Sequence, residues 1–398
     1  MDDKNVKLKP KVGTPAVGDD EFFGREAELR LLIEKVTWGN SVYISAPRRI
    51  GKTSLMQRAE KVLEGSGHSC FFYTLEGSSP ADWIYKLAFD MYERANVKDS
   101  VVALIKNVLS SEKLSWQEAL KSITNSEQWD RQGKNFFKAL HDSCPEGKRI
   151  VILLDELAIM VQNMQDNRPE NEHFLEWLRS IHQEYHKKIS FVIASSIGLH
   201  PLLKRLKLST HVNYLENFQL DAWRPETAKE CILALSRGTE GKIEISPETA
   251  ERMTEMIGWC SPYYVQAFFS AVHDFLTINK RVSCSIDDLQ EIYYKHLIRS
   301  IGPTLCHMEE RLGKSLSKQE NSLAREVLNM MSLNDGDTAK AELRKIKDGK
   351  EFRNKINEES FRNVIDVLEH DGYIEESDAG YHFLSKLLRD WWRKRYGN

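Results

Sequence analysis

Two short groups of residues in this chain of 398 combine side chains suited to holding and cleaving a polyphosphate. The first is the octet Ala46-Pro47-Arg48-Arg49-Ile50-Gly51-Lys52-Thr53. A phosphate-binding loop (P-loop) has the pattern G-x-x-x-x-G-K-[ST] between a strand and a helix, because backbone N–H groups and a helix N-terminus must surround the phosphates. The octet departs from that pattern only in its first residue, where Ala46 replaces glycine. It therefore predicts a loop that binds ATP.

Each residue type at the end of the octet has a separate task. Gly51 allows the backbone to approach a phosphate, Lys52 can reach the β- and γ-phosphates, and the Thr53 hydroxyl can ligate Mg²⁺. A Gly-Lys-Thr-Ser sequence can also occur by chance in an ordinary turn, but here a strand pattern precedes it and a helical pattern follows. We expect nucleotide contacts from Pro47, Arg48, Arg49, Ile50, Gly51, Lys52, Thr53 and Ser54.

The second group follows further along the chain, at Val151-Ile152-Leu153-Leu154-Asp155-Glu156. Its apolar residues predict a buried strand with two carboxylates at the C-terminal end, which is the Walker B pattern. Asp155 would hold Mg²⁺ through its water shell, while Glu156 would orient or deprotonate the attacking water. The alternative is a helix-capping acid followed by a solvated glutamate. Because binding alone does not require the second carboxylate, the pair favours ATP hydrolysis.

The elements that must position these groups are predicted by runs of apolar residues. Continuous runs of this kind are typical of parallel strands that helices cover on both faces, so the fold class is α/β. A long helical stretch, 81–141, is expected to break near Asn96 and around 130–133, and a polar loop is expected at 162–171. The predicted strands are 41–46, 69–75, 149–154, 189–194 and one within 211–220.

From Trp223 onward the pattern changes to helices, which predicts a helical lid. Near the C-terminus, helices at 323–331 and 361–370 precede two short strands around an Asp/Gly turn, which is typical of a winged helix-turn-helix. The expected organisation is a flexible tail at 1–20, a P-loop core at 21–222, a lid at 223–300, a linker at 301–320 and a winged helix at 321–398.

Bulk composition limits the partners. The net charge is −3 although 29% of residues are charged, so no global charge favours nucleic acid or membrane. Met1 to Asp20 lacks the apolar stretch of a secretory signal, and no run reaches the roughly 20 apolar residues of a membrane helix. The six cysteines are scattered without metal-site spacing, which indicates reduced thiols. A cytoplasmic location and no membrane partner are expected.

With these residues in hand, the chain resembles the AAA+-related P-loop ATPases, specifically the prokaryotic and archaeal ATPase group of the STAND (signal-transduction ATPase) clade. The resemblance rests on 22–28, 47–55, 153–156, 195–199 and 258–264. It implies a five-stranded parallel sheet in which the strand ending at Ser195 separates the Walker B strand from the P-loop strand. It also implies a sensor 1 role for Ser195 or Ser196, a sensor 2 region around Pro262, and an adenine-side segment with Gly24 and Arg25.

Several of these assignments have alternatives. A serine at the end of a strand also caps the following turn in many proteins, and Tyr263 and Tyr264, which follow Pro262, could stack on adenine or simply pack the lid. Hydrolysis also requires a cation against the γ-phosphate. Arg48, Arg49 and Arg179 are candidates for that arginine finger, and a solvated or salt-bridged arginine is the default for each.

The charged residues of the C-terminal unit do not point to a single kind of partner. Its wing is acidic, through Glu375, Glu376 and Asp378, whereas basic residues gather at 340–355 and 389–395. Those clusters could contact a nucleic acid backbone, or stay solvated while Trp391 and Trp392 pack the last helix.

We therefore expect a nucleotide-driven switch with a protein partner or self-association. The family resemblance implies a setting in prokaryotic regulation or defence. One alternative is a DNA-binding ATPase of the origin-recognition kind in replication or repair. Another is a nucleotide-binding scaffold without turnover.

Overall fold

The computed structural model describes residues 6–94, 129–164 and 168–397. The chain divides into two compact units. The sheet unit comprises Glu26–Ser45 and Lys52–Gln219, and the helical unit comprises Met1–Arg25, Ala46–Gly51 and Leu220–Asn398. The division falls inside the phosphate loop, between Gly51 and Lys52.

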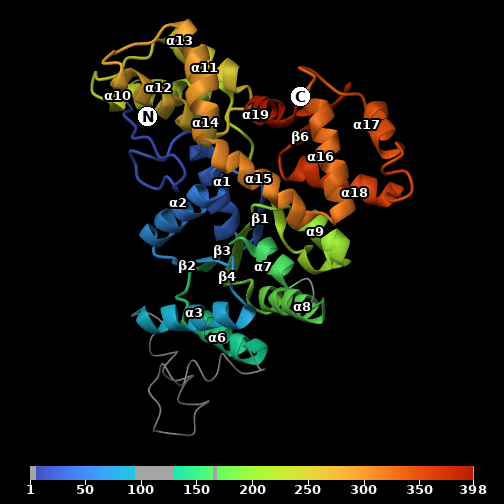
Figure 1. The fold of residues 1–398 in the computed structure, drawn as a ribbon. Coiled ribbons are helices and arrows are strands. Elements are labelled where there is room, and N and C mark those ends of the chain that lie inside the picture. Colours follow the sequence, from blue (N-terminus) through green and yellow to red (C-terminus); the bar gives the residue numbers. More distant parts are fainter. Residues whose placement is uncertain (1–5, 95–128, 165–167, 398) are drawn as a thin grey trace. The chain divides into compact units, whose positions relative to one another are not determined.

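The sheet unit is built on five parallel strands in the order β2-β3-β4-β1-β5 (Figure 1). The strands are β1(Val42–Ser45), β2(Ser69–Thr74), β3(Ile150–Asp155), β4(Ile189–Ala194) and β5(Glu216–Gln219). All residues of β3 and β4 are buried, as expected for strands covered on both faces. The fold class is thus α/β, and β4 separates the β3 strand from the P-loop strand β1, as the resemblance implied.

Alternate residues of β3 face the two layers of helices. Ile150, Ile152 and Leu154 join one apolar core, while Val151 and Leu153 are buried on the opposite face. The first face is covered by α3(Pro80–Glu93), α6(Trp129–Ser143) and α8(Arg168–Tyr185), and the opposite face meets α1(Glu26–Thr37) and α2(Lys52–Gly65). The unit also contains α7(Leu157–Asn163), α9(Leu199–Leu206) and η2(Ser209–Val212).

Two local expectations for the sheet unit need correction. Residues 130–133, expected as a break, lie inside α6, where Gly133 is packed tightly against Trp177. Gln162, expected in a loop, lies in α7, and α8 begins at Arg168. The fifth strand lies within the expected 211–220 range, after η2. The break expected near Asn96 lies outside the described residues.

The helical unit begins with a lid-like group of helices. They are α10(Pro225–Gly238), α11(Pro247–Ile257), α12(Pro262–Ile278), α13(Ile286–Glu291), the π-helical η3(Ile292–Leu297) and α14(Ile298–Ser300). Prolines 225, 247 and 262 each occupy the first helical turn, where a missing N–H is tolerated. Residues of the expected flexible tail pack on this group, because Leu8 is buried and its N–H donates to the Ala234 carbonyl at 3.1 Å.

The remaining elements of the helical unit are α15(Gly302–Ser315), α16(Lys318–Ser332), α17(Lys340–Lys347), α18(Glu358–His370), β6(Ile374–Ser377), β7(Gly380–Phe383) and α19(Lys386–Tyr396). The segment 301–320, expected as a linker, is therefore mostly helix. Strands β6 and β7 form an antiparallel hairpin, and Thr338 bridges Tyr381 beside it. One continuous apolar core runs from α10 to α19.

Candidate functional site

Two residues expected to bind Mg²⁺ lie in contact in the sheet unit. Thr53, in the first turn of α2, donates its hydroxyl to a carboxylate oxygen of Asp155 at 2.7 Å. Asp155 ends β3 with only 5% of its surface exposed. Burial raises the pKa of Asp155, the adjacent Glu156 carboxylate adds to the rise, and the Thr53 hydroxyl and Lys52 oppose it. A cation beside this buried carboxylate would compensate the cost of its charge.

Glu156 is brought together with both candidate sensor serines. One of its carboxylate oxygens accepts hydrogen bonds from the Ser195 hydroxyl at 3.1 Å, and from the Ser196 N–H and hydroxyl, both at 2.8 Å. The Glu156 backbone has φ +64°, and its N–H donates to the Ala194 carbonyl at 2.8 Å. The carboxylate is thus oriented by the end of β4, the strand next to β3.

The first part of the phosphate loop belongs to the helical unit. Gly51 has φ +97°, and apart from Gly51 and its two chain neighbours no heavy atom of the described residues lies within 4 Å of the position where a Cβ would stand. The Ile50 side chain is buried, and its carbonyl accepts a hydrogen bond from Arg25 at 3.4 Å. Arg25 also donates to the Asp221 carbonyl. The loop therefore turns its side chain inward at Ile50 and leaves open space at Gly51, which suits close approach of a phosphate.

The adenine-side segment packs within the helical unit. The Trp223 indole donates to the Gly24 carbonyl at 3.0 Å, and the Phe23 and Trp223 rings meet edge to face. A Cβ on Gly24 would come within 2.6 Å of Thr227, so glycine is required there. Gly24 and Arg25 thus fix the chain before α1, and Arg25 contacts the loop itself.

The two loop arginines contact helices α12 and α15. Arg48 lies 3.0 Å from His307, and the Arg49 guanidinium lies 4.5 Å from the centre of the Tyr263 ring. Arg49 also donates to the Thr304 hydroxyl at 3.3 Å. Arg179, the third finger candidate, lies in α8 and donates to the Thr210 carbonyl at 3.4 Å.

The expected sensor 2 region contacts the loop through the residue before Pro262. The Ser261 hydroxyl donates to the Arg49 carbonyl at 2.6 Å. Sequence reasoning singled out neither Ser261 nor the α15 residues Thr304 and His307. Pro303, at the start of α15, was a usable signal for a helix, but no local pattern indicates that this helix contacts the loop.

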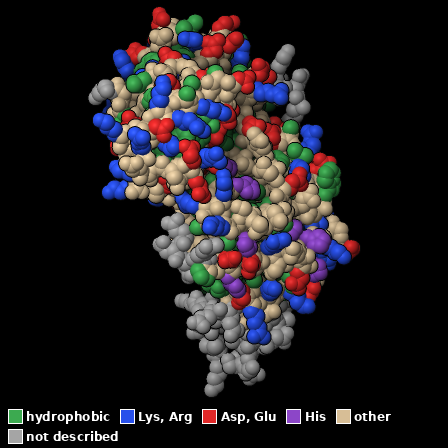
Figure 2. Space-filling model, turned by 90° about the vertical axis from the view of Figure 1, so that its right-hand side faces the viewer, with side chains coloured by type: hydrophobic (Ala, Val, Ile, Leu, Met, Phe, Trp, Pro, Cys, Tyr) green, Lys and Arg blue, Asp and Glu red, His purple; other side chains and the backbone are tan. Residues whose placement is uncertain are grey.

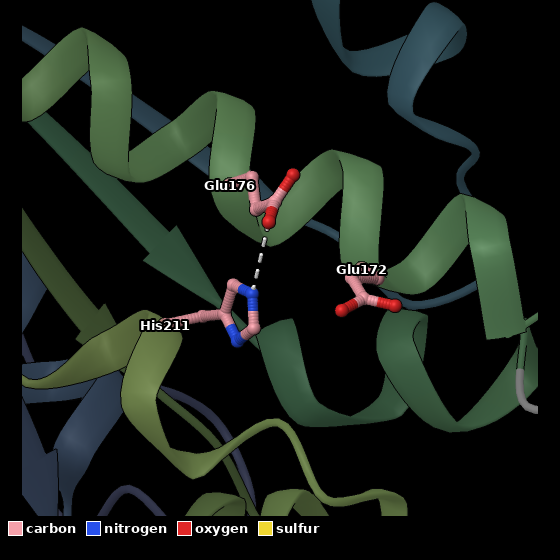
Figure 3. Close-up of side chains that lie close together, drawn as sticks. All are labelled: Glu172, Glu176 and His211. Carbon is pink, nitrogen blue, oxygen red and sulfur yellow. Dashed lines mark hydrogen bonds and ion pairs between the residues drawn. The ribbon is translucent and has the colours of Figure 1, made fainter.

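A separate group of possible metal ligands lies elsewhere in the sheet unit. Within the described residues, this group is formed by Glu172, Glu176 and His211, whose ligand atoms all lie within 4.8 Å of one another (Figure 3). His211 faces Glu176 at 3.4 Å, and the side chain of Glu176 is 62% exposed. An ordinary surface ion pair accounts for this contact.

The residues present fit a magnesium nucleotide. Lys52 is buried at the start of α2, and Thr53 and Asp155 supply adjacent oxygen ligands within the sheet unit. No described helix is long and apolar enough to cross a membrane. All six cysteines are free, and four of them are buried.

Comparison with solved structures supports the fold. The chain is similar to the Walker-type ATPase paby2304 of Pyrococcus abyssi, with 15% sequence identity, a TM-score of 0.59, and coverage of 96% of this chain and 99% of that chain. It is also similar to the Aeropyrum pernix ORC2 protein in its ADPNP-ADP complexes, with 13% identity, a TM-score of 0.53, and coverage of 96% and 98%. At these identities the likeness concerns the fold alone.

The comparison of family models is more specific. No curated protein matches the chain. A family model described as an ATPase domain predominantly from Archaea matches residues 22–258, which is more than half of the chain and includes the phosphate loop, Asp155, Glu156 and the two serines. The chain belongs to this family of ATPase domains.

Proposed function

We propose that the chain binds ATP with Mg²⁺ and hydrolyses it to ADP and phosphate. The observation that carries the proposal is the contact of Glu156 with Ser195 and Ser196 beside the Thr53–Asp155 pair. A carboxylate held in one orientation beside residues that can hold Mg²⁺ suits a residue that positions or deprotonates water.

Different residues of the chain bind the phosphates, hold the metal ion and accept the proton. Lys52 and the loop backbone bind the phosphates, Thr53 and Asp155 hold the metal ion, and Glu156 accepts a proton from water. The bound Mg²⁺ would neutralise charge on the phosphates. Ser195 and Ser196 orient Glu156 through their hydroxyls.

Single-turnover hydrolysis tests this proposal. We expect Glu156→Gln to retain ATP affinity but to lose about a hundredfold or more in the hydrolysis rate, because the amide cannot take a proton. Lys52→Ala should instead weaken ATP binding. If the wild-type protein bound ATP but hydrolysed it no faster than Glu156→Gln, the chain would be a nucleotide-binding scaffold.

We further propose that nucleotide state drives a STAND-like switch, with the lid 223–300 and the winged helix 321–398 as its moving and output parts, in prokaryotic regulation or defence. The supporting observation is that the loop residues Arg48 and Arg49 contact α12 and α15, so a change at the loop reaches these helices directly. The output partner is proposed to be a protein or a second copy.

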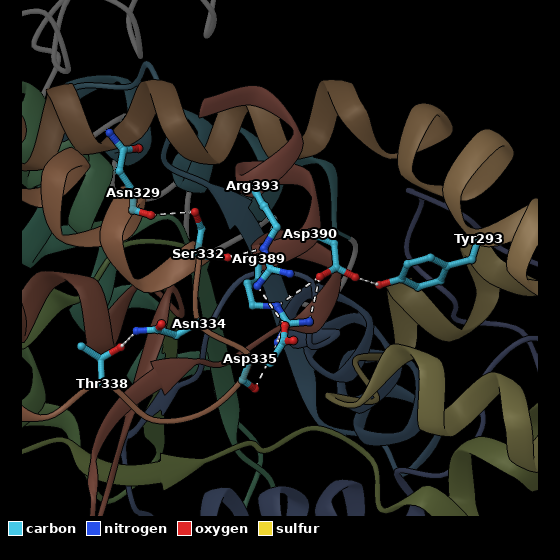
Figure 4. Close-up of polar contacts among 9 residues, drawn as sticks. All are labelled: Tyr293, Asn329, Ser332, Asn334, Asp335, Thr338, Arg389, Asp390 and Arg393. Atoms are coloured by element: carbon cyan, nitrogen blue, oxygen red, sulfur yellow. Dashed lines mark hydrogen bonds and ion pairs between the residues drawn. The ribbon is translucent and has the colours of Figure 1, made fainter. Parts of the chain in front are cut away.

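A protein partner is favoured over DNA by the pairing of basic residues near the C-terminus. Lys340 pairs with Glu376 and Lys347 with Glu358, while Arg389 and Arg393 both pair with Asp335 (Figure 4). On the face drawn in Figure 2, Lys and Arg side chains are interspersed with Asp and Glu. Such pairs offer phosphates little uncompensated charge.

Fluorescence anisotropy with duplex DNA at two salt concentrations tests this choice of partner. Salt-dependent binding to the duplex would overturn the preference and favour the origin-recognition alternative.

A further inference from the structure

Four consecutive residues of the phosphate loop, 47–50, are contacted by other residues of the helical unit. A Cβ on Gly372 would lie only 2.7 Å from the Pro47 side chain, so the backbone there passes close to the loop. Arg48 meets His307, Arg49 meets α12 and α15, and Arg25 donates to the Ile50 carbonyl. Residues 47–50 of the loop are thus supported by contacts within the helical unit.

Arg49 is the residue with the most demanding conformation in this stretch. Its φ of +67° lies in the left-handed region, which residues with a Cβ seldom adopt unless their surroundings hold them there. Ser261 holds its carbonyl at 2.6 Å, Thr304 accepts from its guanidinium, and the Tyr263 ring covers the same group. Both the backbone and the side chain of Arg49 are therefore fixed.

The groups that hold Arg49 also hold one another. The Tyr263 hydroxyl lies 2.9 Å from the Thr304 hydroxyl, which joins the first turn of α12 to the first turn of α15. Thr304 and His307 are spaced three residues apart and so share one face of α15. Burial, together with the Arg48 and Arg311 charges, lowers the pKa of His307, which keeps its ring neutral and able to accept from Arg48.

We propose that Ser261, Tyr263, Thr304 and His307 form a loop brace, which holds the phosphate loop in its binding conformation before ATP arrives. They are positioning residues that act through Arg48 and Arg49. These two arginines then serve as anchors of the loop, and not as the arginine finger. The inference rests on the proposed binding of ATP to this loop. Because the loop is already ordered in the folded protein, ATP binding does not have to supply the free energy of ordering it.

The test compares Tyr263→Leu with Tyr263→Phe. Tyr263→Leu removes the ring over Arg49, so we expect the ATP dissociation constant to rise about tenfold, while kcat at saturating ATP stays within about twofold of wild type. Tyr263→Phe keeps the ring and loses only the hydroxyl contact, so its effect should be smaller. Tyr294→Leu, which removes a tyrosine that is 54% exposed in the same unit, is the matched control.

Hydrogen exchange of the loop amides at 48–51 in nucleotide-free protein gives a second measurement. The brace predicts about tenfold faster exchange there in Tyr263→Leu than in wild type or Tyr294→Leu, with unchanged exchange in β3. If wild-type protein failed to bind ATP, the proposed function would fall while this exchange experiment still tested the brace. Unchanged loop exchange in Tyr263→Leu, or tighter ATP binding by that variant, would overturn the brace.

Discussion

At the scale of residues, the orientation of Glu156 depends on two serine hydroxyls and one backbone N–H. We expect the double variant Ser195→Ala with Ser196→Ala to lower the single-turnover hydrolysis rate about tenfold, because only the Ser196 N–H then orients the carboxylate. ATP affinity should be unchanged. Ser180→Ala, which removes a hydroxyl bonded to the Trp177 carbonyl, is the control. A double variant as fast as the control would remove these serines from the proposed mechanism.

The same residues show what the sequence could predict about the site. Lys52, Thr53, Asp155 and Glu156 follow from local patterns, because each motif lies at a strand end and its residue types have specific chemistry. The contact of Glu156 with Ser195 and Ser196 depends on the pairing of β3 with β4 and on the left-handed backbone of Glu156. Neither the strand pairing nor the backbone conformation of Glu156 can be predicted from the local sequence, although the family resemblance implied the strand order.

At the scale of elements, His182 of α8 joins its helix to the start of β1. Its Nδ1 lies 3.0 Å from the hydroxyl of Ser41, which also accepts from the Phe191 N–H at 3.0 Å. The Ser41 hydroxyl keeps its own proton and can donate it to His182 when the imidazole is neutral. Burial, with a smaller effect of the nearby His186, lowers the pKa of His182 to about 4, from about 6.5 in an unfolded chain.

This lowered pKa gives the pH dependence of stability a definite sign. Between pH 6.5 and about 4 the unfolded chain binds a proton at His182 that the folded chain does not, so the free energy of unfolding should fall as the pH falls through this window. Urea denaturation at pH 7.5, 6 and 5 measures this dependence. His182→Gln should be less stable at pH 7.5 but should show a shallower decline. Equal slopes for the two proteins would contradict the assignment.

Strands such as β3 and β4 were predicted well, because burial on both faces produces an unbroken run of apolar residues. A helix such as α15 was predicted less well, because its apolar residues recur only every three or four positions. In α15, Leu305, Met308 and Leu312 are buried at helical spacing, although the segment was expected as a linker. The break expected around 130–133 had the opposite cause, because Gly133 is required by the close approach of Trp177 and not by a turn.

At the scale of the whole molecule, the helical unit has one apolar core from α10 to α19. Tyr293 of η3 donates to Asp390 of α19 at 2.9 Å, and Asp390 also pairs with Arg389 at 2.9 Å (Figure 4). Trp392 is fully buried and its indole donates to Asn329 at 2.7 Å. The lid-like helices and the C-terminal elements are therefore expected to unfold together as one cooperative unit.

A substitution at Trp392 tests that cooperativity. Trp392→Ala should lower the free energy of unfolding of the helical unit by about 3 to 5 kcal/mol, through the cavity that it leaves and the lost hydrogen bond. Because the core is continuous, hydrogen exchange should accelerate in α10 and α12 as well as in α16. Trp38→Ala, at a tryptophan that is 69% exposed in the sheet unit, should change neither the free energy of unfolding of the helical unit nor hydrogen exchange in these helices. Faster hydrogen exchange confined to α16 and α19 would mean that this unit contains two independent cores. A conformational change caused by nucleotide would then have to pass between the two cores through contacts such as Tyr293 to Asp390.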